Sequence, residues 1–117
     1  MSANHQIDAL KSVFPDLEVG KEGGTDFILI REMPLPDGCV PNRVDGLLCP
    51  SARDGYPSRL FLSESIAHFG KGTNWNAAGV RILGRQWWAV SWMTRADQTL
   101  IEMIQNHLIA FQNESPN

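Results

Sequence analysis

Two cysteines and three histidines are the residues in this sequence best suited to nucleophilic or metal chemistry. The cysteines are Cys39 and Cys49, and the histidines are His5, His68 and His107. A structural zinc site needs four such ligands at short, regular spacings, and these five residues show no such spacing. Two cysteines in a chain of 117 residues also do not make a disulfide framework. We therefore expect no metal site.

The two thiols have different sequence surroundings. Cys49 follows two leucines and precedes Pro50, at the end of a predicted strand. A free cysteine buried there behaves as a small hydrophobic residue, and a reactive thiol is the alternative. Cys39 follows Asp37-Gly38 in a turn-rich segment, which predicts an exposed and oxidisable thiol.

Four tryptophans lie within 18 residues of each other, and two interpretations are open for them. Large amphipathic rings so close together can frame a groove for an extended peptide tail, or they can fill the core. If Trp87 and Trp88 lie on a strand, one side chain faces in and the other faces out. The four tryptophans are Trp75, Trp87, Trp88 and Trp92. We expect at least two of them to lie in the core.

These residues must be positioned by short elements at both ends of the chain and in its first half. Apolar spacing predicts a helix over residues 5–14, ended by Pro15. Strands are predicted, from β-forming residues and flanking turns, at 17–21, 25–33, 43–49 and 59–63. The apolar run within 25–33 indicates burial on both faces of that strand. Tyr56-Pro57 is interpreted as the structural end of a turn into the strand at 59–63.

The second half of the chain is predicted to be less regular until its last helix. Residues 70–79 are small and polar and indicate a loop, and residues 80–93 indicate a bent or two-part segment interrupted by Gly84. A helix is predicted over 97–111, with Thr94 and Asp97 as candidate caps. The apolar stripe of this helix comprises Leu100, Ile101, Ile104, Leu108 and Phe111.

Composition and charge narrow the class of protein. One α+β domain over residues 1–111, built around an antiparallel meander, fits this order of elements, with a flexible tail at 112–117. The formal charge is −3 and Lys and Arg form no run, so no basic footprint for nucleic acid is present. The longest apolar stretch is far shorter than the roughly 20 residues needed to cross a membrane, and the N-terminus does not resemble a signal peptide. We expect a cytoplasmic protein.

The order of elements and several motifs resemble the ubiquitin-conjugating enzyme superfamily. In that superfamily a third strand runs into a loop with Tyr-Pro, and a short apolar fourth strand follows at once. The segments LPDGCVPNRVDGLLCP and DGYPSRLFL, followed later by GRQWWAVSWM and an amphipathic helix, are similar to its prokaryotic family E group. The resemblance covers roughly residues 17–111. It implies an N-terminal helix, a four-stranded antiparallel meander and a C-terminal helix.

The resemblance also implies a site, and this chain departs from the family's pattern there. Conventional members carry His-Pro-Asn and a catalytic Cys, and this chain has neither motif. Ser91, within Ala89-Val90-Ser91-Trp92-Met93, occupies the place of that cysteine. The group commonly has Ser-Trp here, so the resemblance implies an oxyester-forming serine. A hydroxyl needs an adjacent base or positioned dipoles.

Several residues are candidates for those helping groups. His68 follows the fourth strand much as the family's motif histidine does, and His107 and Asp97 are further candidates for a base or orienting group. Asn74 and Asn76 could donate an amide to an oxyanion, or simply satisfy a glycine-rich turn. Small-residue packing between Trp88 and Trp92 is the alternative role for Ser91.

The implied function is that of an acyl carrier. The resemblance implies that the protein accepts the C-terminal acyl group of a ubiquitin-like protein from an adenylating enzyme, with no dissociable cofactor. A deconjugating peptidase is a further expected member of the pathway. The site is bracketed in the sequence by Arg81, Arg85 and Arg95. These arginines could contact acidic groups on the partners, or they could simply be solvated. Two alternatives stay open: a catalytically inactive binding module of this fold, and an unrelated α+β interaction domain.

Overall fold

Two helices lie at the two ends of the described chain. The computed structural model describes residues 3–53, 55–68, 71–72, 75–90, 92, 94–95 and 97–111. Helix α1 spans Ala3–Val13 and α2 spans Leu100–Ile109, so both predicted helices are confirmed. Within these residues, no helix has the length and apolarity needed to cross a bilayer. The predicted tail at 112–117 lies outside the described residues.

Helix α2 begins later than the sequence suggested. Its N-cap is Thr99, whose Oγ1 accepts from the Glu102 backbone N–H at 3.2 Å, while Glu102 Oε1 accepts from the Thr99 N–H at 2.8 Å. This reciprocal pair satisfies two N–H groups that a helix end otherwise leaves unpaired. The predicted caps, Thr94 and Asp97, were wrong. Asp97 has a φ of 64°, outside the helical region, and the Thr94 hydroxyl contacts Ser58 instead.

The strands form one large and one small antiparallel sheet. The large sheet has six strands in the order β1-β2-β4-β5-β9-β8. Their bounds are Glu18–Glu22, Thr25–Pro34, Arg43–Cys49, Arg59–Leu62, Arg85–Val90 and Trp75–Ile82, in that order. The small sheet has the order β3-β6-β7, with bounds Cys39–Val40, Ala67–His68 and Lys71–Gly72. The α+β class and the antiparallel meander through β1, β2, β4 and β5 are confirmed.

The number of strands differs from the four expected in the meander, because a hairpin of β8 and β9 extends the sheet. Residues 75–79, predicted as a loop, are the first part of β8. The asparagine, alanines and glycine at 76–79 gave no strand signal, yet pairing with β9 holds this stretch extended. The pairing is irregular between Trp75 and Ala77 and between Ala78 and Val80. The predicted break at Gly84 is confirmed. Leu83 and Gly84 form the hairpin turn with φ values of 52° and 80°, as two-residue hairpin turns require.

The large sheet is strongly curled. β1 and β8 are its opposite edges, yet the Leu83 backbone N–H donates to Glu22 Oε1 at 2.8 Å. A Cβ on Gly20 of β1 would lie 3.0 Å from Leu83 Cδ1. The turn between β8 and β9 therefore comes over the surface of β1.

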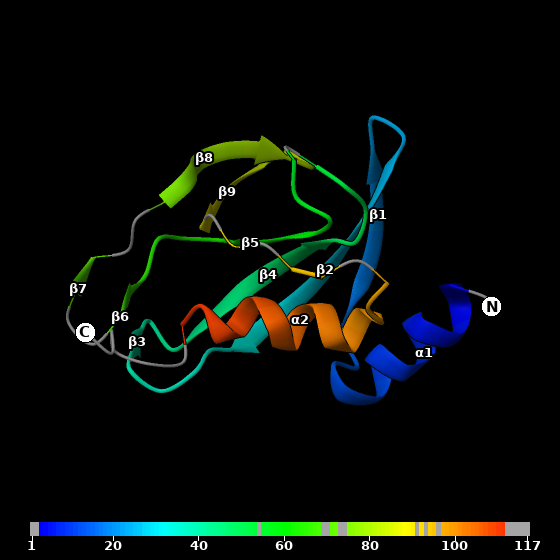
Figure 1. Cartoon of the computed structure of the whole chain (residues 1–117), viewed down its shortest axis with the longest axis horizontal. Coiled ribbons are helices and arrows are strands. Elements are labelled where there is room, and N and C mark those ends of the chain that lie inside the picture. Colours follow the sequence, from blue (N-terminus) through cyan, green and yellow to red (C-terminus); the bar gives the residue numbers. More distant parts are fainter. Residues whose placement is uncertain are drawn as a thin grey trace.

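The curl leaves the central strands buried on both faces. One cluster packs with α2 and includes Ile28, Ile30, Leu48, Leu60, Leu62, Leu100 and Ile104. The other lies on the opposite face and includes Phe27, Leu47, Cys49, Phe61, Ile82 and Trp87. Figure 1 shows α2 lying along the sheet, with α1 near one end of the molecule and β3, β6 and β7 near the other. The expected two-sided burial of the strand at 25–33 is confirmed for Phe27, Ile28 and Ile30.

Candidate functional site

The structure describes the three residues predicted to be catalytic only in part. Ser91 lies outside the described residues. The backbones of His68 and Asn76 are described, in β6 and β8, but their side chains are not. Asn74 also lies outside the described residues.

The backbone pairing brings one of these positions close to the end of β9. Trp75 pairs with Val90 and Ala77 pairs with Ala89, so Asn76 is an extra residue in β8 opposite this end of β9. Ser91 follows Val90 in the sequence. His68 pairs with Cys39 and Lys71 in the small sheet, and no described pairing joins that sheet to β9.

The chain that follows β9 is fastened to two other parts of the fold. The Arg59 Nη2 donates to the carbonyl oxygen of Val90 at 3.3 Å. The indole N–H of Trp92 donates to Asn106 Oδ1 in α2 at 3.1 Å. The hydroxyl oxygens of Thr94 and Ser58 lie 2.8 Å apart. These contacts hold residues on both sides of position 91.

Ser58 extends this arrangement to α2. Its Oγ lies 3.0 Å from His107 Nε2 in addition to contacting Thr94. The exposed fractions of Ser58, Thr94 and His107 are 1%, 4% and 5%. Sequence reasoning named His107 but missed Ser58, because 49 positions separate the two residues. The one available signal was that Ser58 directly follows Tyr56-Pro57.

The imidazole of His107 is neutral at pH 7. Burial, and to a smaller extent the charge of Arg59, lowers its pKa from 6.5 to about 4. Its Nε2 is already in contact with Ser58, so the described geometry does not offer this atom to a substrate. Asp97, the other candidate from this region, is exposed and precedes α2.

The guanidinium of Arg59 is buried among aromatic rings. Arg59 is 2% exposed, and its Cζ lies 4.4 Å from the centre of the Tyr56 ring and 5.5 Å from that of Phe61. Attraction between a cation and aromatic faces offsets part of the lost hydration. Tyr56 thus helps to position the side chain that binds the Val90 carbonyl.

Both thiols are buried. Cys49 is 0% exposed within the cluster opposite α2, and its Sγ lies 3.5 Å from the Ser51 carbonyl oxygen. This burial favours the interpretation of Cys49 as a core residue. Cys39 is 4% exposed, so the expectation of an exposed thiol was wrong: the small sheet places it beside Phe111. Burial raises the pKa of the Cys39 thiol, which disfavours the thiolate.

The tryptophans divide between core and surface. Trp87 is 1% exposed and its indole N–H donates to the Ile82 carbonyl at 2.9 Å. Trp88, the next residue of β9, is partly exposed and lies on the opposite face of the strand. The expected inward ring is therefore Trp87, and Trp88 is the more exposed of the pair. Trp75 packs against the cluster on the α2 side. At least two of the four rings therefore contribute to the core, as expected.

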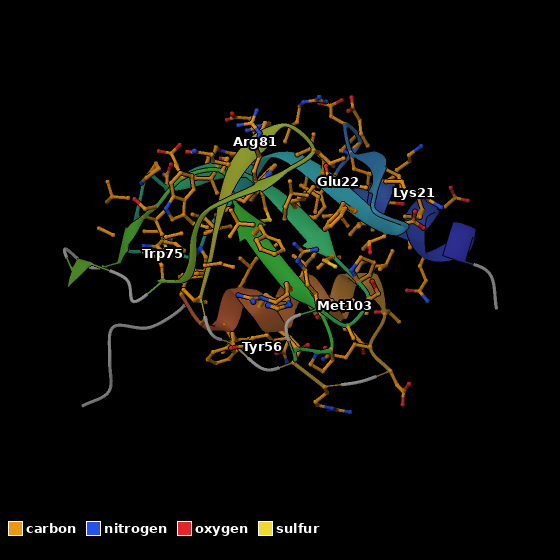
Figure 2. All side chains as sticks on the ribbon, turned by 90° about the horizontal axis from the view of Figure 1, so that it is seen from above. Lys21, Glu22, Tyr56, Trp75, Arg81 and Met103 are labelled. Carbon is orange, nitrogen blue, oxygen red and sulfur yellow. The ribbon has the colours of Figure 1, made fainter. Side chains whose placement is uncertain are left out.

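The three arginines named from the sequence lie in different surroundings. Arg85 Nη2 is 3.0 Å from Asp45 Oδ2, and its guanidinium lies 4.8 Å from the centre of the Trp87 ring. Arg81 and Arg95 are exposed. Figure 2 shows Arg81 on the side of the sheet away from α2 and Trp75 at the start of β8. Arg81 is therefore remote from the contacts made by α2.

The described residues hold no group of three or more His, Cys, Asp or Glu side chains arranged to bind a metal ion. A cleft of about 360 Å³ lies between the end of α1 and the bulged end of β2, and none of the predicted catalytic residues lines it.

Comparison with protein-family models, curated proteins and solved structures finds no significant match.

Proposed function

We propose that this protein is a ubiquitin-conjugating-like carrier in a bacterial pathway that conjugates a ubiquitin-like protein. It accepts the C-terminal acyl group of that protein from an adenylating enzyme, as an oxyester on Ser91, and passes it to an amine. A deconjugating peptidase of the same pathway would reverse the final step. The proposal places the protein in the cytoplasm, where ATP is available to the adenylating enzyme.

The chemistry is acyl transfer through a covalent intermediate. The Ser91 oxygen forms an ester bond to the acyl carbon while the bond to the activating enzyme breaks, and the hydroxyl proton passes to a base. An amine nitrogen then attacks the ester carbon, and the serine oxygen leaves and recovers a proton. Neither step needs a metal or an electron acceptor.

One observation carries this proposal. The two residues that follow Tyr56-Pro57 contact both sides of position 91. Ser58, at the end of the loop, contacts the Thr94 hydroxyl, and Arg59, the first residue of β5, binds the Val90 carbonyl. One of the motifs that carry the resemblance is thus joined by hydrogen bonds to described residues on either side of the proposed nucleophile. The meander of β1, β2, β4 and β5, with this loop between β4 and β5, gives further support.

The helping groups receive unequal support. Asn76 is proposed as an oxyanion donor, and its backbone lies opposite the end of β9. His68 is proposed as the base on the resemblance alone, since its strand belongs to the small sheet.

Burial of both thiols favours a second candidate, a binding module without catalytic activity. Neither Cys39 nor Cys49 is accessible to an acyl donor in this structure, and the His107 Nε2 contacts Ser58. Such a module would bind the ubiquitin-like protein tightly and without a covalent bond.

The test mixes the purified chain with ATP, a candidate activating enzyme and a candidate ubiquitin-like protein. Both candidates are taken from the genes that flank the gene of this chain. An adduct that survives a thiol reductant, is cleaved by mild base and is absent from Ser91→Ala supports the proposal. Ser12→Ala, at an exposed serine of α1, is the matched control and should form the adduct normally.

Two other outcomes separate the alternatives. An adduct cleaved by thiols and absent from Cys49→Ala would reject the serine while keeping the carrier function. Tight association with no adduct under any condition would reject the carrier in favour of the binding module.

A further inference from the structure

Three buried side chains form a continuous polar connection between three separate parts of the chain. Ser58 lies in the loop that enters β5, Thr94 follows β9, and His107 belongs to α2. Ser58 Oγ is the centre of the connection, within hydrogen-bonding distance of both other groups. Each hydroxyl can donate one hydrogen bond and accept others, and a neutral imidazole has one donor and one acceptor nitrogen. The connection can therefore be satisfied without a charge.

The burial of this cluster makes each partner costly to lose. All three side chains are at most 5% exposed, so water cannot readily replace a missing partner. An unsatisfied buried polar group costs more than the hydrogen bond itself contributes. A fully satisfied polar network also specifies one local geometry, which apolar contacts do less strictly.

Residues next to Ser58 and His107 in the chain contact residues close to Thr94. Arg59 holds the carbonyl of Val90, and Asn106, adjacent to His107 in the chain, holds the indole of Trp92. Val90, Trp92 and Thr94 are thus each held by a hydrogen bond to another part of the fold. The contact of Trp92 is made by α2, and that of Thr94 is made by Ser58, which in turn contacts His107 of α2. Removal of His107 would leave Ser58 free to turn and Thr94 without a rigid partner.

We propose that His107 and Ser58 are positioning residues for the acyl transfer assigned to Ser91, because they hold Thr94, three positions later in the chain. This inference rests on the proposed function, because the reaction that benefits is the one assigned to Ser91. His107 acts through Ser58 and Thr94 and does not touch the substrate, since its side chain is buried and its Nε2 contacts Ser58. Misplacement of a reacting group by about 1 Å can lower a rate by about 100-fold.

The experiment compares four proteins: the native chain, His107→Leu, His107→Gln and Ser58→Ala. Leucine fills a similar volume without polar atoms, whereas the glutamine amide can still bond to Ser58. Ser58→Ala removes the central hydroxyl directly. Circular dichroism and thermal unfolding define a temperature at which every variant is folded, and all rates are compared there.

The first measurement needs no partner. Amide hydrogen exchange in peptides that cover residues 90–95 should be at least about tenfold faster in His107→Leu, the size expected when one buried hydrogen bond is lost. Exchange in β2 and β4 should be unchanged, and glutamine should restore slow exchange at 90–95. Equal exchange in all proteins would overturn the proposal whatever the activity.

The second measurement uses charging by the activating enzyme. His107→Leu and Ser58→Ala should lower kcat for adduct formation by roughly 10- to 100-fold with little change in KM, and His107→Gln should recover most of it. A normal adduct on the native chain with unchanged kcat in His107→Leu would overturn the positioning role alone. No adduct on the native chain would overturn the proposed function and this inference together.

A third measurement tests whether Ser58 is itself a nucleophile. A fluorophosphonate probe should leave Ser58 unlabelled, because its hydroxyl is buried. Rapid labelling of Ser58 that disappears in His107→Leu would overturn the positioning role and make Ser58 and His107 a reactive pair.

Discussion

The side-chain oxygen of Gln6 in α1 accepts a hydrogen bond from the backbone N–H of Leu100, the first residue of α2, at 3.0 Å. Helix N-termini leave several N–H groups without partners inside the helix. Thr99 satisfies the N–H of Glu102, and Gln6 satisfies another from a residue 94 positions away. The first helix therefore contributes directly to the start of the last one.

Gln6→Ala should lower the free energy of unfolding by about 0.5–1.5 kcal/mol, because the Leu100 N–H loses its partner. Urea unfolding followed by tryptophan fluorescence measures the change. Gln105→Ala, at an exposed position of α2, is the matched control and should have little effect. Equal losses in the two variants would argue against a specific role for the Gln6 contact.

Stability should fall in mild acid because of His107. Its pKa is about 4 in the folded protein against 6.5 for the free side chain, so the unfolded state binds more protons between these values. The contribution is complete above pH 6.5 and is lost as pH falls towards 4, by up to about 3 kcal/mol. Unfolding free energies measured from pH 7 to pH 4 should show this slope in the native chain and a smaller one in His107→Gln. The same slope in both proteins would assign the acid sensitivity to other groups.

Gly46→Ala should destabilise the protein by about 1–3 kcal/mol through overpacking. A Cβ at this position would lie 2.8 Å from Met33 Cε and 2.9 Å from Met33 Sδ, and Met33 is 0% exposed. Gly20→Ala is the control, since its nearest neighbour is the end of the Leu83 side chain, which is 37% exposed and free to move. Denaturation midpoints compare the two variants. A larger loss at Gly20 would contradict the packing argument.

The two thiols should react only when the protein opens. Cys39 and Cys49 are buried in different clusters, so an aromatic disulfide reagent should modify the native chain at least about 100-fold more slowly than the unfolded chain. Ser12→Cys places a third thiol on the exposed face of α1 and should give one rapid equivalent. A rapid equivalent in the native chain would identify an accessible thiol and reopen the cysteine alternative.

The sequence located elements whose boundaries are set by local chemistry. The strand at 43–49 was predicted at its observed limits, where Pro50 follows it and turn residues precede it. The apolar run in β2 and the stripe in α2 were equally clear, because each depends on residues close together in the chain. The start of α2 was misplaced, since Thr94 and Asp97 are also of residue types that cap helices, and only the tertiary fold uses Thr94 elsewhere.

What the sequence could not supply depends on long-range pairing. Residues 76–79 are asparagine, two alanines and glycine, which are poor strand formers, and they are extended because β9 returns beside them. The contact between Ser58 and His107 joins residues 49 positions apart, and neither residue alone indicates it. Among the candidate site residues, Ser91 and Asn74 and the side chains of His68 and Asn76 lie outside the described part of the chain, so their assigned roles stay predictions.

Arg59 has a consequence for how β5 can pair. All four residues of this strand are buried, with Arg59 and Phe61 on one face and Leu60 and Leu62 on the other. Apolar side chains on both faces would tolerate a slip of one residue, which exchanges the two faces of a strand. Such a slip would place the guanidinium in the apolar cluster against α2, away from Tyr56 and the Val90 carbonyl. The leucines and the phenylalanine of β5 are compatible with either pairing register. Arg59 is compatible with one register alone, and it therefore fixes the alignment of the strand.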